Sequence, residues 1–257
     1  MFTNVHNDDG RFGSQMGSEA RRDLPGNLDR ILGYFPGADH MIVWLDYTDT
    51  QRLAQLQQFT EVLKRCEPGD VVRVTLNAYE RTLAASDWQA AGFATPGHCR
   101  AKKLRDQIGD FFPADVDRIL ENGMPSVLAS AVAIAAAKAE AETHTRFLPV
   151  LHTSYADGQR MFTATVLCVA DDRKLINGLK GWEFLSRDWS RITEISVPDL
   201  SIREKVAIDR LLSRGPKAII RALKFRPASE LDDAHLAIGS YKRLHRFYPT
   251  FHAIGVQ

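Results

Sequence analysis

Hydrophobic positions along residues 41–76 alternate between two kinds of pattern. Residues 41–47, MIVWLDY, form a nearly continuous apolar run that ends in polar residues, as expected of a strand buried on both faces. Residues 51–66 then repeat apolar side chains, including Leu53, at helical spacing, and residues 71–76 form a second run rich in β-branched residues. This order predicts a right-handed βαβ unit whose two strands are parallel neighbours.

A long helix and a hairpin are predicted further along the chain. Residues 125–144 have a helical pattern with a face of small residues that allows close packing on a sheet. These small residues are Ser126, Ala129, Ala133, Ala136 and Ala137. Two strand-like runs, 146–155 and 161–169, flank Ala156-Asp157-Gly158-Gln159, and Asp-Gly is a strong hairpin signal. The predicted sheet therefore ends in an antiparallel pair.

The remaining segments divide the chain into three predicted parts. Residues 1–40, rich in Gly, Asn, Asp and Arg, predict an arm of loops with one helix over 27–34. Residues 41–172 form a Rossmann-like α/β domain with a partial, mixed sheet. An insertion near 79–125 carries turn signals, among them Thr95-Pro96-Gly97, and a short helix over 101–111.

The pattern of residues 173–257 predicts a basic helical appendage. Helices are expected near 201–212, 216–225 and 229–245, the first opened by a capping box of Ser201 and Glu204. From residue 201 onward there are eleven lysines and arginines but five aspartates and glutamates. A basic face there could follow the phosphates of a nucleic acid, whereas the alternative is a solvated face over a helical core. The candidate residues are Lys217, Arg221 and Lys224, at helical spacing on one face, and Lys242, Arg243 and Arg246.

Composition narrows the class of protein. The 257 residues are 44% hydrophobic and 25% charged with a formal charge of +1, which is typical of a globular protein and not of one built wholly to attract nucleic acid. Cys66, Cys99 and Cys168 are far apart, so neither a disulfide framework nor a zinc site is predicted. The N-terminus lacks a signal-peptide pattern, and the apolar stretch 126–137 is too short to span a membrane. We therefore expect a cytoplasmic protein without membrane contact.

The order of elements over residues 40–170 resembles the C-terminal half of a class I S-adenosylmethionine-dependent methyltransferase, whose sheet closes with an antiparallel hairpin strand. In that family a short acidic or polar aromatic motif ends the fourth strand and faces the methyl group and the acceptor. The matching position here is Leu45-Asp46-Tyr47-Thr48-Asp49. The segment Asn7-Asp8-Asp9-Gly10-Arg11 also resembles members of the "putative O-methyltransferase" type. The resemblance implies S-adenosylmethionine as cofactor, with Asp46 and Tyr47 orienting the acceptor for direct, in-line methyl transfer.

One departure from that family concerns the cofactor. Class I methyltransferases hold it with a glycine-rich turn after the first strand, because only glycine lets the backbone approach the ligand closely. No G-x-G triplet occurs in this chain, and 40 residues are too few for three strands with their helices. The chain is therefore interpreted as a truncated or split relative that acts with a partner chain. The alternative is a non-catalytic binding module on a degenerate Rossmann-like scaffold. A sheet edge left open by missing strands predicts a homo-oligomer or a partner chain that covers it.

Polar residues at the two predicted strand ends are the remaining candidates. Asp46 lies where open α/β sheets bind ligands, and Asp49, Thr75 and Asn77 are candidates for substrate binding beside it. The alternatives are that Asp49 or Thr48 caps the next helix, that Tyr47 belongs to the core, and that Asn77 forms a turn.

Other residues with chemical potential favour structural roles. His98 and Cys99 lack a third orienting group and are expected in a surface loop. His152 and Tyr155, on the first hairpin strand, are expected to be structural. The acidic residues form no readable metal triad.

Overall fold

A computed structural model of the chain describes residues 2–6, 40–170, 178–179, 181–196, 200–227 and 231–247. Its contacts divide the chain into two compact units, Met1–Glu194 and Ile195–Gln257. The first unit continues past residue 172 because the segment around Ser186 and Trp189 packs on the hairpin. The amide of Ser186 donates a hydrogen bond to the carbonyl of Val150 (2.9 Å), and Trp189 packs against the hydrophobic core.

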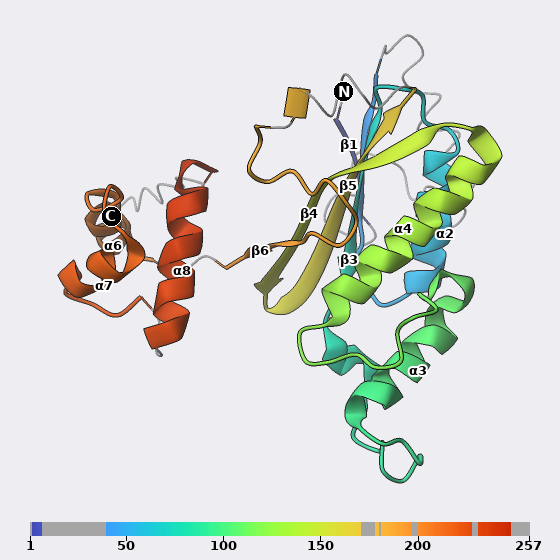
Figure 1. The fold of residues 1–257 in the computed structure, drawn as a ribbon, viewed down its shortest axis with the longest axis horizontal. Helices are drawn as coiled ribbons and strands as arrows, with labels where there is room; N and C mark the ends of the chain where they lie inside the picture. The colour runs from blue at the N-terminus through green and yellow to red at the C-terminus, as the bar shows by residue number, and fades with distance from the viewer. Residues whose placement is uncertain are drawn as a thin grey trace, which may run out of the picture. The chain divides into compact units, whose positions relative to one another are not determined.

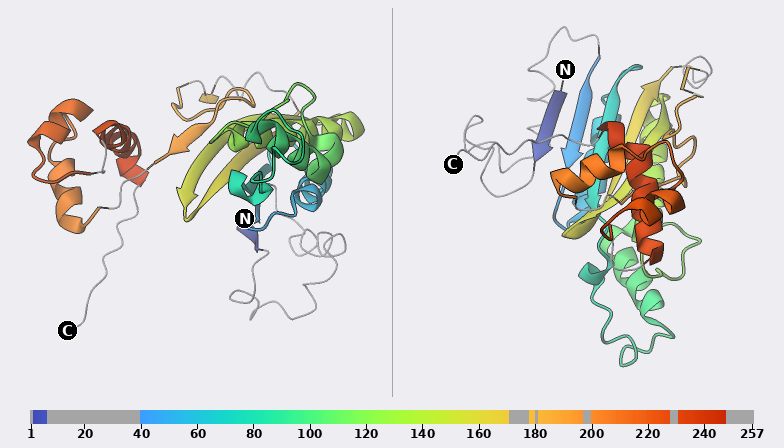
Figure 2. Two further views of the ribbon diagram at one scale, coloured as in Figure 1. Left: turned by 90° about the horizontal axis from the view of Figure 1, so that it is seen from below. Right: turned by 90° about the vertical axis from the view of Figure 1, so that its left-hand side faces the viewer.

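The first unit is built on a mixed, six-stranded sheet in the order β1-β2-β3-β5-β4-β6 (Figure 1). β1, β2 and β3 are parallel, and β5 lies antiparallel between β3 and β4. Figure 2 (right) shows the strands from blue β1 to yellow β5 side by side. The bounds are β1 Phe2–His6, β2 Ile42–Asp46, β3 Val71–Asn77, β4 Arg146–Asp157, β5 Gln159–Val169 and β6 Thr193–Ile195. The predicted α/β class, parallel pair and closing hairpin are confirmed.

β1 was not predicted, because the sequence analysis assigned residues 1–40 to loops and one helix. Phe2–His6 instead forms an edge strand that pairs in parallel with Ile42–Asp46. Only two of its five residues, Phe2 and Val5, are apolar, so the segment has no clear strand pattern. Its strand conformation depends on the hydrogen bonds that the neighbouring strand offers. The predicted helix over 27–34 and the segment Asn7–Arg11 lie outside the described residues.

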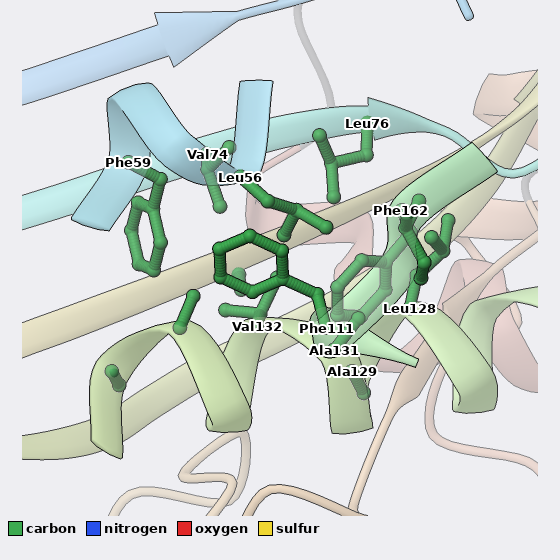
Figure 3. Packing of buried hydrophobic residues seen from close by; sticks show 14 of the residues in the cluster. Leu56, Phe59, Val74, Leu76, Phe111, Leu128, Ala129, Ala131, Val132 and Phe162 are labelled. Atoms are coloured by element: carbon green, nitrogen blue, oxygen red, sulfur yellow. The ribbon is translucent and has the colours of Figure 1, made fainter. Parts of the chain in front are cut away.

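Two helices cover one face of the sheet. α2 (Arg52–Leu63) and α4 (Met124–Thr143) pack against each other and against the strands, and α3 (Pro96–Ile108) lies beside α2 (Figure 1). The core between them is apolar and close-packed, as Figure 3 shows. It brings together Leu56 and Phe59 of α2, Val74 and Leu76 of β3, Phe162 of β5, and Leu128 and Val132 of α4.

The opposite face of the sheet is not covered by α2, α3 or α4, and we call it the helix-free face with respect to these three helices alone. In β2 the buried side chains of Val43 and Leu45 alternate with the half-buried Ile42, Trp44 and Asp46. The prediction that this strand is buried on both faces was therefore wrong. The apolar run misled because Ile42 and Trp44 have the composition of a core but lie on the helix-free face.

The predicted insertion, residues 79–125, contributes to the same core. α3 begins at Pro96, five residues before the predicted start, with Thr95 as its N-cap. Pro96 occupies the first turn, where a proline suits a helix, so the supposed turn Thr95-Pro96-Gly97 is a helix start. Cys99 is consequently buried within α3 and not in a surface loop. The other elements here are the 3-10 turns η2 (Glu80–Leu83) and η3 (Gly109–Phe111).

α4 is the central helix of the core. It agrees with the predicted range 125–144, but Ser126 and Ala137 of the predicted small-residue face are exposed, whereas Ala131 and Ala135 are fully buried. Among the described residues, α4 is the one helix whose length and apolar composition would allow it to cross a membrane. More than half of it is buried against the sheet and α2, as in the core helix of an α/β unit.

The second unit contains α6 (Ile202–Asp209), α7 (Pro216–Ala222), α8 (Leu231–Leu244) and the 3-10 turn η4 (His245–Phe247). The predicted capping box of Ser201 and Glu204 opens α6. The small core of the second unit contains Ile208, Ile219, Ile238 and Tyr241. α7 ends three residues before the predicted end, because Leu223 is extended and turns back, with Phe225, onto this core.

Candidate functional site

The carboxyl ends of β2 and β3 bring two predicted site residues together. Asp46 and Thr75 are direct partners in the parallel register. Thr75 is fully buried, and its hydroxyl accepts a hydrogen bond from the indole N–H of Trp44 (2.9 Å). The hydroxyl of Thr163 on β5 approaches it at 3.5 Å. Thr75 therefore links β2, β3 and β5, while Asp46 is half-buried on the helix-free face.

Tyr47 points into the core on the other side of the sheet. Its ring is 1% exposed, and its hydroxyl donates a 2.6 Å hydrogen bond to Gln58 Oε1 on α2. Burial, reinforced by the negative charge of Asp49, raises the pKa of Tyr47 above its usual range. Such a phenol stays protonated and engaged, so the core interpretation of Tyr47 agrees with its contacts.

Asp49 stabilises the start of α2. Its carboxylate Oδ1 accepts the backbone N–H of Gln51 (2.8 Å) and the side-chain amide of Gln55 (2.6 Å). A carboxylate at this end of a helix also opposes the positive end of the helix dipole. The N-cap of α2 is Gln51 and no side chain caps it, so the capping alternative was wrong, and Asp49 instead holds the turn that leads into the helix.

Asn77 connects three segments at the end of β3. Its amide nitrogen donates to the carbonyl of Thr48 (3.0 Å) and to Gln159 Oε1 (2.6 Å), while its Oδ1 accepts the backbone N–H of Tyr79 (3.0 Å). The last bond is the Asx turn typical of Asn. With the side chain 1% exposed, Asn77 acts as a structural tie among the β2 loop, the hairpin and η2.

Arg52 is a prominent residue that the sequence analysis missed. Its side chain is 1% exposed and donates to the carbonyl of Asn77 (3.0 Å), to Gln107 Oε1 (3.0 Å) and to Thr82 Oγ1 (2.8 Å). Burial lowers the pKa of Arg52 to about 10, and the charge of Asp49 opposes that shift.

A signal for Arg52 was present in the sequence. Position 52 shares a helix face with Leu56, Phe59 and Leu63, all of which are fully or nearly fully buried. Leu53, which the sequence pattern assigned to the buried face, is 40% exposed.

The helix-free face carries a second group of polar side chains. Arg73 of β3 lies in register between Trp44 of β2 and Thr165 of β5, and its guanidinium carbon lies 5.0 Å from the centre of the Trp44 ring. Burial lowers the pKa of Arg73, while Tyr155 and Asp46 oppose this shift through their negative charges. Asp46, Trp44 and Arg73 thus form one polar and aromatic patch next to the strand ends.

His152 lies on the helix-covered face of β4, apart from that patch. It is fully buried between Phe162 and Trp189, with ring centroids 5.8 and 5.4 Å away. Its Nδ1 donates to the carbonyl of Trp189 (3.2 Å), while its Nε2 has no hydrogen-bond partner among the described residues. Burial lowers the pKa of His152 to about 4, which keeps the ring neutral. The contacts support the structural interpretation of this residue.

His98 occupies the first turn of α3. Its Nδ1 lies 2.7 Å from the hydroxyl of the N-cap residue Thr95, and its Nε2 lies 4.0 Å from Asp117. These contacts stabilise the helix start. Within the described ranges no group of three His, Cys, Asp or Glu side chains is placed to hold a metal ion.

The basic residues of the second unit are dispersed more than predicted. Lys217 and Arg221 are exposed on α7, but Lys224 lies beyond the end of that helix, so the predicted shared helical face was wrong for Lys224. Lys242 donates to the carbonyl of Arg214 (2.8 Å). Arg243, on α8, and Arg246, in η4, are exposed.

Comparison with known proteins assigns the chain to a family. The family model described as "Putative O-methyltransferase" matches residues 21–256, a range that includes every candidate residue discussed above. No curated protein matches the chain.

Proposed function

The chain belongs to the family described as "Putative O-methyltransferase", and from this premise we propose that it transfers a methyl group from S-adenosylmethionine to an oxygen atom of its acceptor. The position of Asp46 in the sheet is the observation on which the proposal rests. Asp46 ends β2 on the helix-free face, directly opposite Thr75. In open α/β sheets ligands bind outside the carboxyl ends of the strands.

Asp46 suits the reacting end of that cofactor. S-adenosylmethionine supplies an electrophilic methyl group on a positively charged sulfur. A half-buried carboxylate attracts such a cation more strongly than an exposed one does, because water screens it less. The same carboxylate accepts the hydrogen bond of an acceptor hydroxyl, holds its oxygen in line and takes up its proton as the oxygen is methylated, and orientation is the main contribution of Asp46.

Neighbouring residues position Asp46. Tyr47 follows it in sequence and is anchored to Gln58 of α2, and Thr75 opposite it is held by Trp44 and Thr163. Tyr47 is therefore proposed as a positioning residue that does not touch the acceptor.

The nucleoside part of the cofactor needs contacts beyond those that Asp46 provides. The chain has no G-x-G triplet to bring a backbone close to the nucleoside part. We therefore propose that a partner chain completes the cofactor site, which makes this protein one subunit of the enzyme.

Calorimetric titration of the full chain with S-adenosylmethionine and S-adenosylhomocysteine tests the proposal. We expect saturable binding that weakens at least about ten-fold in Asp46→Ala, because a charge-assisted contact is lost. Asp106→Ala, which removes an exposed carboxylate on α3, is the matched control and should bind like the natural protein. Absence of binding at millimolar ligand would favour the non-catalytic binding module.

Nucleic-acid binding by the second unit is a second candidate function. The exposed Lys217 and Arg221 lie one helical turn apart on α7, where they could contact neighbouring phosphates. Binding of a single-stranded RNA oligonucleotide should weaken with salt, and the slope of that dependence should fall by about one per neutralised contact in Lys217→Gln and Arg221→Gln. Lys102→Gln on α3 is the control. Equal slopes in all three variants would remove this candidate.

A further inference from the structure

We propose that the helix-free face of the sheet binds an oxyanion, a phosphate or a carboxylate group, through Arg73 together with the hydroxyl groups of Thr165 and Thr153. This inference rests on the proposed function, because it names the class of acceptor that the site near Asp46 takes. Four observations carry it: the register of three strands, the unpaired donors, the position of the guanidinium, and the distance to Asp46.

The strand register brings the three side chains together. Arg73 of β3 and Thr165 of β5 are direct antiparallel partners. Thr163, two residues away on β5, pairs with Thr153 of β4. Direct partners have Cβ atoms about 5 Å apart on the same face, and diagonal neighbours about 7 to 8 Å. The three residues therefore form one contiguous cluster across β3, β5 and β4.

These three residues hold unpaired hydrogen-bond donors. In the described part of the chain, six buried side-chain nitrogen or oxygen atoms lack a hydrogen-bond partner, and three of them are Arg73 Nε, Thr165 Oγ1 and Thr153 Oγ1. The other three are Gln55 Oε1, Glu80 Oε2 and His152 Nε2. Those are acceptors, since the Nδ1 of His152 carries the proton that it donates to Trp189.

The unpaired donors thus gather at one place on the sheet. A buried donor without a partner is costly, so native proteins seldom keep one without a reason. Thr153 is only 4% exposed, which leaves water little access to its hydroxyl. An oxyanion has acceptor oxygens alone, so it satisfies an N–H and two O–H groups at once.

Arg73 is held where such a group would meet it. Its guanidinium lies over the Trp44 ring, and its buried Nε has no hydrogen-bond partner among the described residues. The planar guanidinium matches two oxygens of a phosphate or carboxylate. Asp46 and Tyr155 are the negatively charged or ionisable groups close enough to influence Arg73, so they limit the affinity for an anion alone.

The distance between Arg73 and Asp46 indicates which two groups the acceptor molecule carries. Thr75, the direct partner of Asp46, lies two residues beyond Arg73 on β3, which is roughly 7 Å along the strand. An acceptor held by its anionic end at Arg73 can therefore reach Asp46 with a hydroxyl several bonds away. The structure assigns a hydroxylated phosphate ester or hydroxy acid to this site.

Titration of the full chain, isotope-labelled for amide NMR, with phosphate, acetate or chloride at constant ionic strength tests the inference. We expect saturable shifts of the amide signals of residues 73, 153 and 165 with phosphate, with acetate, or with both, and none with chloride. A response to phosphate alone supports a phosphate ester, and a response to acetate alone supports a carboxylate.

Variants test the named side chains. Arg73→Gln should weaken anion binding about ten-fold or more through loss of the charged donor. Arg105→Gln, which removes a guanidinium stacked on Phe112 of the same unit, should not. Thr153→Val and Thr165→Val should also weaken binding, while the melting temperature stays equal or rises because an unpaired hydroxyl has been replaced by a methyl group.

Two results would overturn the inference. One is a set of shifts that never saturates with phosphate or acetate, and the other is equal binding by Arg73→Gln and the natural protein. Failure of the proposed function is distinguishable, because it abolishes the response to S-adenosylmethionine and leaves anion binding intact. Asp46→Asn separates the two further, since it should weaken binding of S-adenosylmethionine but strengthen binding of phosphate by removing a nearby negative charge.

Discussion

At the residue scale, the polar side chains at the carboxyl ends of β2 and β3 serve two purposes. Asp49 and Asn77 satisfy backbone and amide groups of the surrounding loops, and Arg52 joins α2 to the segments after β3. Asp46 and Arg73 instead lie on the helix-free face. The strand-end position of a residue therefore indicated where chemistry could occur, whereas the direction of each side chain separates structural residues from candidates for binding.

Replacement of Arg52 should show how much the buried guanidinium stabilises the fold. Arg52→Met removes three charge-assisted hydrogen bonds, one of them to the buried carbonyl of Asn77, so we expect a loss of about 3 kcal/mol in the free energy of unfolding. Urea denaturation measures it. Lys102→Met, which breaks an exposed ion pair with Asp106 on α3, should change stability little. Equal stability of the two variants would contradict this role.

Acid should destabilise the first unit through His152. Its pKa is about 4 in the folded protein and about 6.5 in an unfolded chain, so the unfolded state takes up a proton first as the pH falls. The contribution is complete above pH 6.5 and is lost between about pH 6.5 and 4. By pH 5 it should lower the free energy of unfolding by about 2 kcal/mol relative to pH 7.5.

Urea denaturation of His152→Gln at the two pH values isolates that effect. The difference between pH 7.5 and 5 should shrink in His152→Gln, whatever the variant does to stability at neutral pH. His40→Gln, at an exposed histidine of the same unit, should keep the full difference. An unchanged difference in His152→Gln would show that other groups cause the acid sensitivity.

At the element scale, helix ends and helix faces were less predictable than the helices themselves. The start of α3 depends on Thr95 and Pro96, which also have the composition of a turn. The end of α7 depends on Leu223 and Phe225, which turn back onto Ile219 and Ile238. In both places the local residues allow two outcomes, and packing selects one.

The close packing of α4 can be tested on a single helix. Ala135 is fully buried in the core, so Ala135→Leu should destabilise the protein by about 2 kcal/mol through overpacking. Ala137→Leu, at an exposed position of the same helix, should stay within about 0.5 kcal/mol of the natural protein. Thermal denaturation of both variants measures the difference. Similar melting temperatures would mean that the sheet and α4 are less tightly packed than described.

At the scale of the whole molecule, the edge strands of the sheet are the places where a partner chain could bind. Among the described residues, the order of strands ends at β1 on one side and at β6 on the other, and β1 has a single neighbour, β2. An edge strand presents unpaired N–H and C=O groups to a second chain. β1 thus moves the edge outward from the place where the sequence analysis expected it.

We predict that the chain forms a dimer or a larger assembly through this edge. Size-exclusion chromatography with light scattering should give at least twice the 28.8 kDa of one chain. Asn4→Pro removes a backbone N–H from β1 and should shift the assembly toward the monomer. A natural protein that elutes as a stable monomer at all concentrations would oppose a homo-oligomer and leave a partner chain as the cover.

Most elements could be predicted because their patterns are local. The alternation around Val72 and Val74, the Asp157-Gly158 turn, where Gly158 has a φ of +71°, and the Ser201 capping box all require contacts only a few residues apart. The resemblance to methyltransferases came from the order of these elements, and the match over residues 21–256 confirms a methyltransferase-like family, while the C-terminal-half interpretation stays a prediction. β1 could not be predicted, since its partner lies about 40 residues away.

The sequence by itself determined the α/β class, the parallel pair, the closing hairpin, the helical second unit and the position of Asp46 at a strand end, because periodicity and turn chemistry are properties of neighbouring residues. Only the tertiary structure decided that helices cover one face of the sheet, that Arg52 is buried, and that Arg73 meets Thr165 across two strands. Those facts depend on which distant segments pack together. A single residue's type carries no record of its partner across the sheet, and so the candidate anion site emerged only when the strands were paired.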